Sequence, residues 1–183
     1  SLLIIRRIWM DIGFGKMSKL VLQVYLDDAS RRLWAHKLKD KSETLVAFTK
    51  LHRQVENEMH PLKVAACARD NDAAYSGQNW IDYANEHGIQ LEPNGPYRKE
   101  TPIERAIMRT IGGAARAAMH HGNAPESEMF CAIEHSIFCI NQRMHSSNHN
   151  TSHHVYVEWG HTQDVESSDE GSVVLLVLWL HLS

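Results

Sequence analysis

The stretch "KLVLQVYLDDASRRLWAHKL", residues 19–38, predicts two β-strands joined by a short link. Residues 19–26 are rich in branched apolar side chains, and residues 32–38 alternate apolar with polar side chains; both patterns are typical of strands. An apolar run at residues 2–10 predicts a strand before this pair. Because the links between the three strands are short, we expect an antiparallel meander.

The rest of the chain predicts two further strands, with helices before, between and after them in the sequence. Apolar residues three and four apart, between Ser42 and about Met59, indicate an amphipathic helix. A strand at 62–68, a helix ending at Gly88 and a strand at 89–93 follow. Two helices then cover residues 101–121 and 126–144. The predicted fold class is α/β, with a mixed five-stranded sheet of three antiparallel strands and then two more, flanked by helices.

Composition narrows the classes of protein that fit. The chain has 183 residues, 43% of them hydrophobic, and a formal net charge of -3, which is ordinary for one soluble domain. A DNA-binding role would therefore need a local basic surface. Its three cysteines form no CxxC pair, which favours a reduced intracellular protein. The apolar run near the end is far shorter than the roughly 20 residues of a membrane span, and the opening without Met predicts a piece of a longer protein.

Three acids fall at the ends of predicted elements, namely Asp11, Asp70 and Glu104. If the first and fourth strands are neighbours, these carboxylates share one site and suit two divalent metals about 3.5–4 Å apart. Two other interpretations stay open. Thr101 and Glu104 have the spacing of a capping box, and Asp70 in "RDND" suits a turn.

A local excess of basic side chains lies beside the last of these acids. Residues 98–116 contain five cations against two acids, and the cations are Arg98, Lys99, Arg105, Arg109 and Arg116. On a helix, the three that follow Glu104 would lie on broadly one side. Such residues position DNA through its phosphates without reading sequence. A solvated helix face is the alternative.

An ordered series of motifs resembles a known family. The quoted segments are "WMDIGFGK" (9–16), "VYLDDASRRLWAHKLKDKSETLVAF" (24–48), "ARDNDAAY" (68–75), "EHGIQLEPNGPYRKETPIERAIMRTIGGAARAAM" (86–119) and "NAPESEMFCAIEHSIFCINQRM" (123–144). Together they resemble the integrase catalytic core of Ty1/copia-type LTR retrotransposons, a branch of the retroviral integrase superfamily with a ribonuclease H-like fold. The resemblance covers roughly residues 9–144.

The resemblance implies a chemistry and a site. It makes Asp11, Asp70 and Glu104 the catalytic triad that binds two Mg²⁺ or Mn²⁺ ions, and it leaves Asp27 and Asp28 in a structural turn. The activity implied is metal-dependent processing of DNA 3′ ends and strand transfer, which is DNA integration. Implied partners are the element ends, target DNA and further copies of the chain, with integration in the nucleus. Residues 1–144 would form the core, and residues 145–183 a polar connector with a trailing apolar strand.

The sequence also departs from the family pattern around two of the three acids. Asp72 stands where the family has Gly, and Ala74 stands where it has an acid. The segment "YRKETPIER", residues 97–105, lacks the family's Asn-Gly turn and is about two residues short. These losses are typical of a decayed element copy whose activity is lost. A non-catalytic module that binds nucleic acid or protein, and a metal-dependent nuclease, are the alternative functions.

Overall fold

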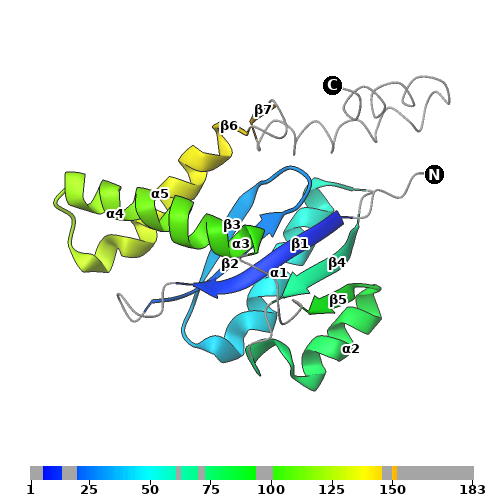
Figure 1. Ribbon diagram of the computed structural model, residues 1–183. Helices are drawn as coiled ribbons and strands as arrows, with labels where there is room; N and C mark the ends of the chain where they lie inside the picture. The colour runs from blue at the N-terminus through cyan, green and yellow to red at the C-terminus, as the bar shows by residue number, and fades with distance from the viewer. Residues whose placement is uncertain are drawn as a thin grey trace, which may run out of the picture.

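The predicted meander forms three of the five strands of the central sheet (Figure 1). The computed structural model describes residues 6–13, 20–60, 63–69, 73–93, 101–145 and 150–151. The meander consists of β1 (Arg6–Gly13), β2 (Val21–Asp27) and β3 (Leu33–Leu38). Both pairings are antiparallel, with Trp9 opposite Leu26 and Tyr25 opposite Trp34.

Two parallel strands complete the sheet on the other side of β1. They are β4 (Val64–Arg69) and β5 (Gln90–Pro93), and the strand order is β3-β2-β1-β4-β5. Parallel strands need crossover connections, and helices supply them. These helices are α1 (Thr44–Glu58), preceded by the 3₁₀ turn η1 (Lys41–Glu43), and α2 (Gln78–His87), preceded by η2 (Ala73–Tyr75). The predicted mixed five-stranded sheet is confirmed.

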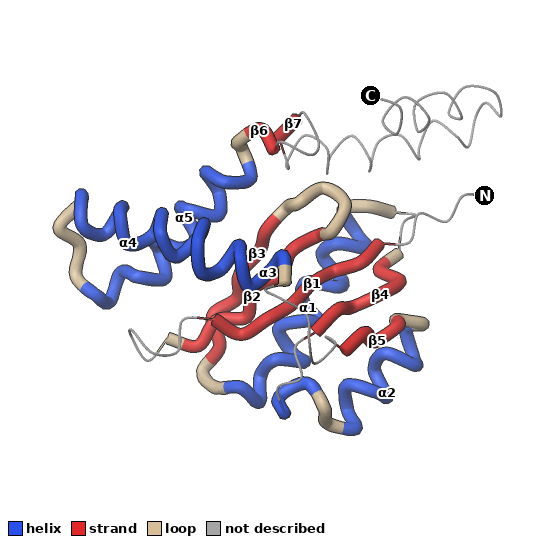
Figure 2. Tube along the Cα trace, viewed as in Figure 1, coloured by secondary structure: helices blue, strands red, loops and turns tan. Residues whose placement is uncertain are grey.

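Helices cover both faces of the sheet (Figure 2). Side chains of α1 and α2, including Phe48, Leu51 and Trp80, pack with Ile8 and Met10 of β1 in one hydrophobic cluster. Because successive side chains of a strand point to opposite faces, Trp9 belongs to the second cluster. That cluster holds the helices that follow β5.

The predicted helix at 101–121 is continuous, but its middle is wider than an α-helix. It consists of α3 (Pro102–Arg105), the π-helical η3 (Ala106–Ile111) and α4 (Gly112–His121). Its buried stripe runs at a spacing of four residues, through Ile103, Ile107, Ile111 and Ala115. In an α-helix such a stripe drifts by about 40° at each step, and the wider π turn reduces this drift.

The last long helix is tied to the edge strand β3 by a side chain. After η4 (Glu126–Glu128), α5 (Met129–Asn141) packs on α4 and β3. The Asn141 side-chain oxygen accepts from Leu33 N at 2.9 Å, and its nitrogen donates to Leu33 O at 3.0 Å. The amide thus occupies both backbone groups that Leu33 would otherwise present to a further strand.

The first strand is longer than the sequence predicts. β1 runs to Gly13, because antiparallel pairing with β2 continues as far as Gly13 and Leu22. Asp11 therefore lies inside the strand and not after its end.

Past residue 144, the structure describes only His145 and β7 (Asn150–Thr151), which pairs with β6 (Met144–His145). The predicted connector and trailing strand otherwise lie outside the described residues. No helix in the described ranges is both long and apolar enough to cross a membrane.

Candidate active site

Asp11 is positioned by the central strand of the sheet. It lies opposite Val24 of β2 and is half-buried. Strand alternation places it on the same face as Trp9, whose side chain packs in the cluster of the α3–α5 helices. Its Oδ1 accepts a hydrogen bond of 2.7 Å from the backbone N–H of Ile12.

Glu104 is positioned by the start of α3. Thr101 is the N-cap and Pro102 follows at the first helical position, as the sequence predicts. The Glu104 Oε2 accepts from Thr101 N at 2.6 Å and from Thr101 Oγ1 at 3.0 Å, while Glu104 N donates to Thr101 Oγ1 at 3.3 Å. The capping box is therefore formed, and it holds the Glu104 carboxylate in a defined place.

Asp11 and Glu104 belong to one face of the sheet. Residues of α3 contact β1 and β2, and Ile103, next to Glu104, is buried in the same cluster as Trp9. Asp70 follows the last residue of β4, Arg69, and lies outside the described residues. Within the described part of the chain, no three His, Cys, Asp or Glu side chains lie close enough to hold a metal ion.

The two described acids have the chemistry that a divalent cation requires. Mg²⁺ and Mn²⁺ take oxygen ligands, and Asp11 and Glu104 are both carboxylates in half-buried positions. Glu104 uses Oε2 in the capping box, so its orientation is set by the helix start. Asp11 and Glu104 thus each supply oxygen ligands of the kind that Mg²⁺ takes.

A third carboxylate on this face is already paired. Glu92 of β5 lies opposite Ala68 of β4, on the face away from the cluster that contains Leu91. Its carboxylate contacts the Arg7 guanidinium at 3.1 and 3.2 Å, so the ion pair passes over β4. Sequence reasoning missed this pair, although strand alternation places Arg7 on the same face as Asp11. The cation neutralises Glu92 on this face of the sheet.

The predicted DNA-binding residues divide into two groups. Arg105, Arg109 and Arg116 are exposed on the continuous helix that begins at α3. Arg98 and Lys99 lie outside the described residues. Of the described three, Arg105 is the residue next to Glu104.

Asp27 and Asp28 hold the turn between β2 and β3. The Asp27 carboxylate is fully buried and accepts from Ser30 N at 3.0 Å and from Ser30 Oγ at 2.6 Å. Asp28 pairs with the Arg31 guanidinium at 3.0 Å. Both acids thus have structural roles, as the sequence predicts.

By sequence, the chain is similar to a retrotransposon polyprotein. No family model matches the chain. Over 119 residues, 64% of the chain, it is 29% identical to the retrovirus-related Pol polyprotein from transposon TNT 1-94 of Nicotiana tabacum. The chain spans 9% of that polyprotein's length.

Solved structures with the same fold include integrase catalytic cores. The HTLV-2 integrase catalytic core domain in complex with magnesium, in its trimeric form, matches at a TM-score of 0.66 with 20% identity, covering 85% of this chain and 99% of that one. The catalytic core domain of BIV integrase matches at 0.62 with 17% identity, covering 86% and 97%. The chain thus has the ribonuclease H-like fold of retroviral integrase catalytic cores, and its sequence resembles the Pol polyprotein of a Ty1/copia-type retrotransposon.

Proposed function

We propose that this chain is the catalytic core of a retrotransposon integrase, which processes DNA 3′ ends and joins them to target DNA with Mg²⁺ or Mn²⁺. The observation that carries the proposal is that Asp11 lies on the face of the sheet on which α3, the helix of Glu104, packs. The similarity to a Pol polyprotein supports the same function. Asp70 is proposed as the third ligand, because β4 is the direct parallel neighbour of β1.

Each proposed residue has a separate task. The bound metal would activate the attacking oxygen and stabilise the leaving oxygen of a phosphodiester. Asp11 would hold the cation from the rigid centre of the sheet, and Glu104 from a helix start fixed by Thr101. Arg105, Arg109 and Arg116, with Arg98 and Lys99, would bind DNA phosphates and so place the reacting bond.

The proposal includes an assembly and a place in the cell. The HTLV-2 integrase catalytic core domain occurs in dimeric and trimeric forms, and a further match is a chain of the simian T-cell lymphotropic virus intasome. By analogy, several copies of this chain would hold the element ends and the target DNA. Integration into a genome would take place in the nucleus.

Calorimetric titration with Mn²⁺ and Mg²⁺ tests the metal site. We expect binding by the unchanged chain that is lost in Glu104→Gln and in Asp70→Asn. Glu128→Gln is the matched control, because Glu128 is an exposed acid near the start of another helix. Metal binding that survives Glu104→Gln would contradict the proposed site.

A joining assay tests the reaction itself. A labelled duplex with a free 3′ hydroxyl is incubated with target DNA and Mn²⁺, and longer labelled products report strand transfer. We expect products with the unchanged chain and none with Asp70→Asn, while equal yields would refute the triad. Shortened products without joining would instead identify a nuclease.

One observation favours a second candidate, a non-catalytic nucleic-acid or protein binding module. The Glu104 carboxylate has a structural task in the capping box, which is sufficient to explain its presence without any metal. The departures at Asp72 and Ala74 agree with lost activity. DNA binding that is unaffected by metal and by all three acid substitutions would support this module and a decayed site.

A further inference from the structure

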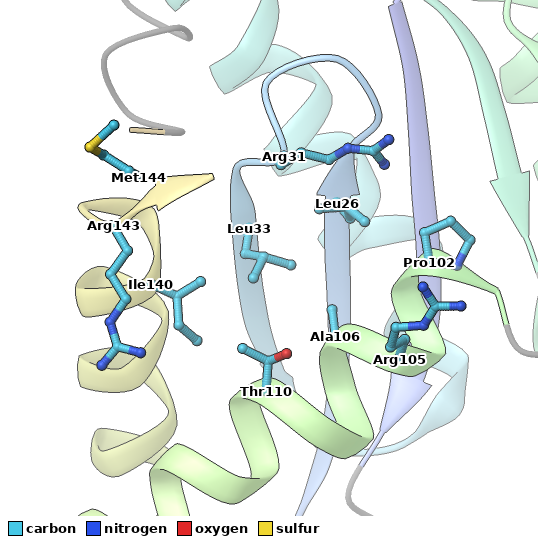
Figure 3. A pocket seen from close by; sticks show the side chains of 10 residues that line it. All are labelled: Leu26, Arg31, Leu33, Pro102, Arg105, Ala106, Thr110, Ile140, Arg143 and Met144. Atoms are coloured by element: carbon cyan, nitrogen blue, oxygen red, sulfur yellow. The ribbon is translucent and has the colours of Figure 1, made fainter. Parts of the chain in front are cut away.

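A groove lies beside the start of α3, on the side away from β4 and β5 (Figure 3). Its volume is about 440 Å³, within the range of roughly 300–1,000 Å³ that is usual for ligand sites. α3 and η3 form one wall, the end of α5 forms the other, and β2, β3 and their turn lie between them. The helix that carries Glu104 is therefore also a wall of this groove.

Three arginines surround the groove from three different elements. Arg31 comes from the β2–β3 turn, Arg105 from α3, and Arg143 from the residues after α5. Asp28, which pairs with Arg31, and the buried Asp27 belong to the turn but do not line the groove. Among the described residues that line it, the charged side chains are all cations, which favours an anionic ligand.

Between the arginines most of the lining residues are apolar, with Thr110 as the polar exception. Leu26 and Leu33 of the strands lie at the floor, and Ile140 of α5 lies on the wall beside them. Met144, which is 73% exposed, adds a further apolar side chain to the lining. An ion such as phosphate would use only the arginines, so a ligand that also has flat apolar surfaces fits better.

We propose that this groove binds single-stranded nucleic acid, with phosphates on Arg31, Arg105 and Arg143 and a base or sugar against the apolar floor. Single strands expose the faces of their bases, which stack on apolar and guanidinium surfaces, whereas a duplex keeps those faces stacked inside. The choice of a nucleic acid rests on the proposed function, because Arg105 directly follows Glu104. A DNA end held at the carboxylates would continue, as an unpaired strand, into the groove.

Fluorescence anisotropy with a labelled ten-nucleotide oligothymidylate, in EDTA, tests the groove without any metal. Arg143→Gln removes one phosphate contact and should weaken binding about fivefold at roughly 0.1 M salt, lowering the salt slope by about 0.7. Met144→Ser should weaken binding with the slope unchanged, because it removes apolar contact and no charge. Both side chains are exposed, so the fold is expected to persist, and thermal unfolding verifies this.

Arg53→Gln is the matched control. Arg53 is an exposed arginine on α1, which packs on the opposite face of the sheet, and it should leave binding unchanged. Equal effects of Arg143→Gln and Arg53→Gln would overturn the proposal. Two further results would also overturn it. One is a short duplex whose binding is weakened by Arg143→Gln as much as that of the oligonucleotide. The other is a decaglutamate peptide that displaces the oligonucleotide from the unchanged chain and loses this ability in Arg143→Gln.

The groove and the proposed integrase function fail separately. If the chain binds the oligonucleotide through Arg143 but never joins DNA, the proposed integrase function is refuted and the proposed binding site in the groove stands. If the chain joins DNA while Arg143→Gln binds the oligonucleotide normally, the binding site in the groove is refuted and the integrase function stands.

Discussion

Replacing Glu104 by Gln and by Ala separates its structural task from its proposed metal chemistry. Gln keeps an oxygen that can accept from Thr101 N, so the capping box survives. It loses the negative charge in the first turn of α3, worth about 0.3–1 kcal/mol next to the helix dipole. Ala loses both the charge and the hydrogen bond.

The expected magnitudes follow from the contacts of the carboxylate. A hydrogen bond to a charged group contributes about 1.5–3 kcal/mol, and the part-buried position of this one places it at the lower end, so Glu104→Ala should destabilise by about 2 kcal/mol. Glu104→Gln should cost about 0.5 kcal/mol. For a chain of this size each kcal/mol lowers Tm by about 2–4 °C, which predicts shifts of about 4–8 °C for Ala and about 1–2 °C for Gln.

Thermal unfolding, followed by far-UV circular dichroism, measures the stability of each variant, and Mn²⁺ calorimetry measures metal binding. Stability should fall from Glu104 to Gln to Ala, whereas metal binding should be lost equally in both variants. If Gln destabilises as much as Ala, the capping box is not what holds this helix start. If Gln binds Mn²⁺ like the unchanged chain, Glu104 is no metal ligand.

Three further predictions concern the fold. Ile111→Ala removes a fully buried side chain of η3 and should cost about 2–5 kcal/mol in urea unfolding, whereas Met108→Ala, at a position 68% exposed, should cost less than about 0.5. Asn141→Leu leaves the backbone N–H and C=O of Leu33 unpaired and should cost about 2–3 kcal/mol, and an unchanged urea midpoint would refute that account. Burial lowers the pKa of His52, and Glu56 opposes this shift in part. Below about pH 6.5, His52 is therefore protonated less often in the folded chain than in the unfolded chain. Stability should therefore be full above about pH 6.5 and fall as the pH drops below it, and His52→Gln should reduce that dependence in Tm measurements.

The strands and helices were predictable because their patterns are local. Alternation in residues 32–38 and the three- and four-residue spacing after Ser42 each reflect one buried face of one element. Thr101 and Pro102 likewise mark the start of α3 by their own backbone chemistry. Asp11 was misplaced at a strand end, because the length of β1 depends on its pairing with β2.

The candidate site was predictable only in part. Asp11 lies on the face of the sheet on which the helix of Glu104 packs. The roles proposed for Asp11, Asp70 and Glu104 remain predictions. Arg31 and Arg143 could not be identified, because they are 112 positions apart and belong to unrelated elements.

The sequence by itself determined the order of the strands along the chain, the cap of α3, and the resemblance that selects three acids out of twenty-two. Each of these depends on neighbours in the chain. Only the tertiary structure decided which groups meet across elements: Glu92 with Arg7, the Asn141 amide with Leu33, and three arginines around one groove. Such contacts depend on strand order and helix packing, which bring distant residues together and leave no local pattern.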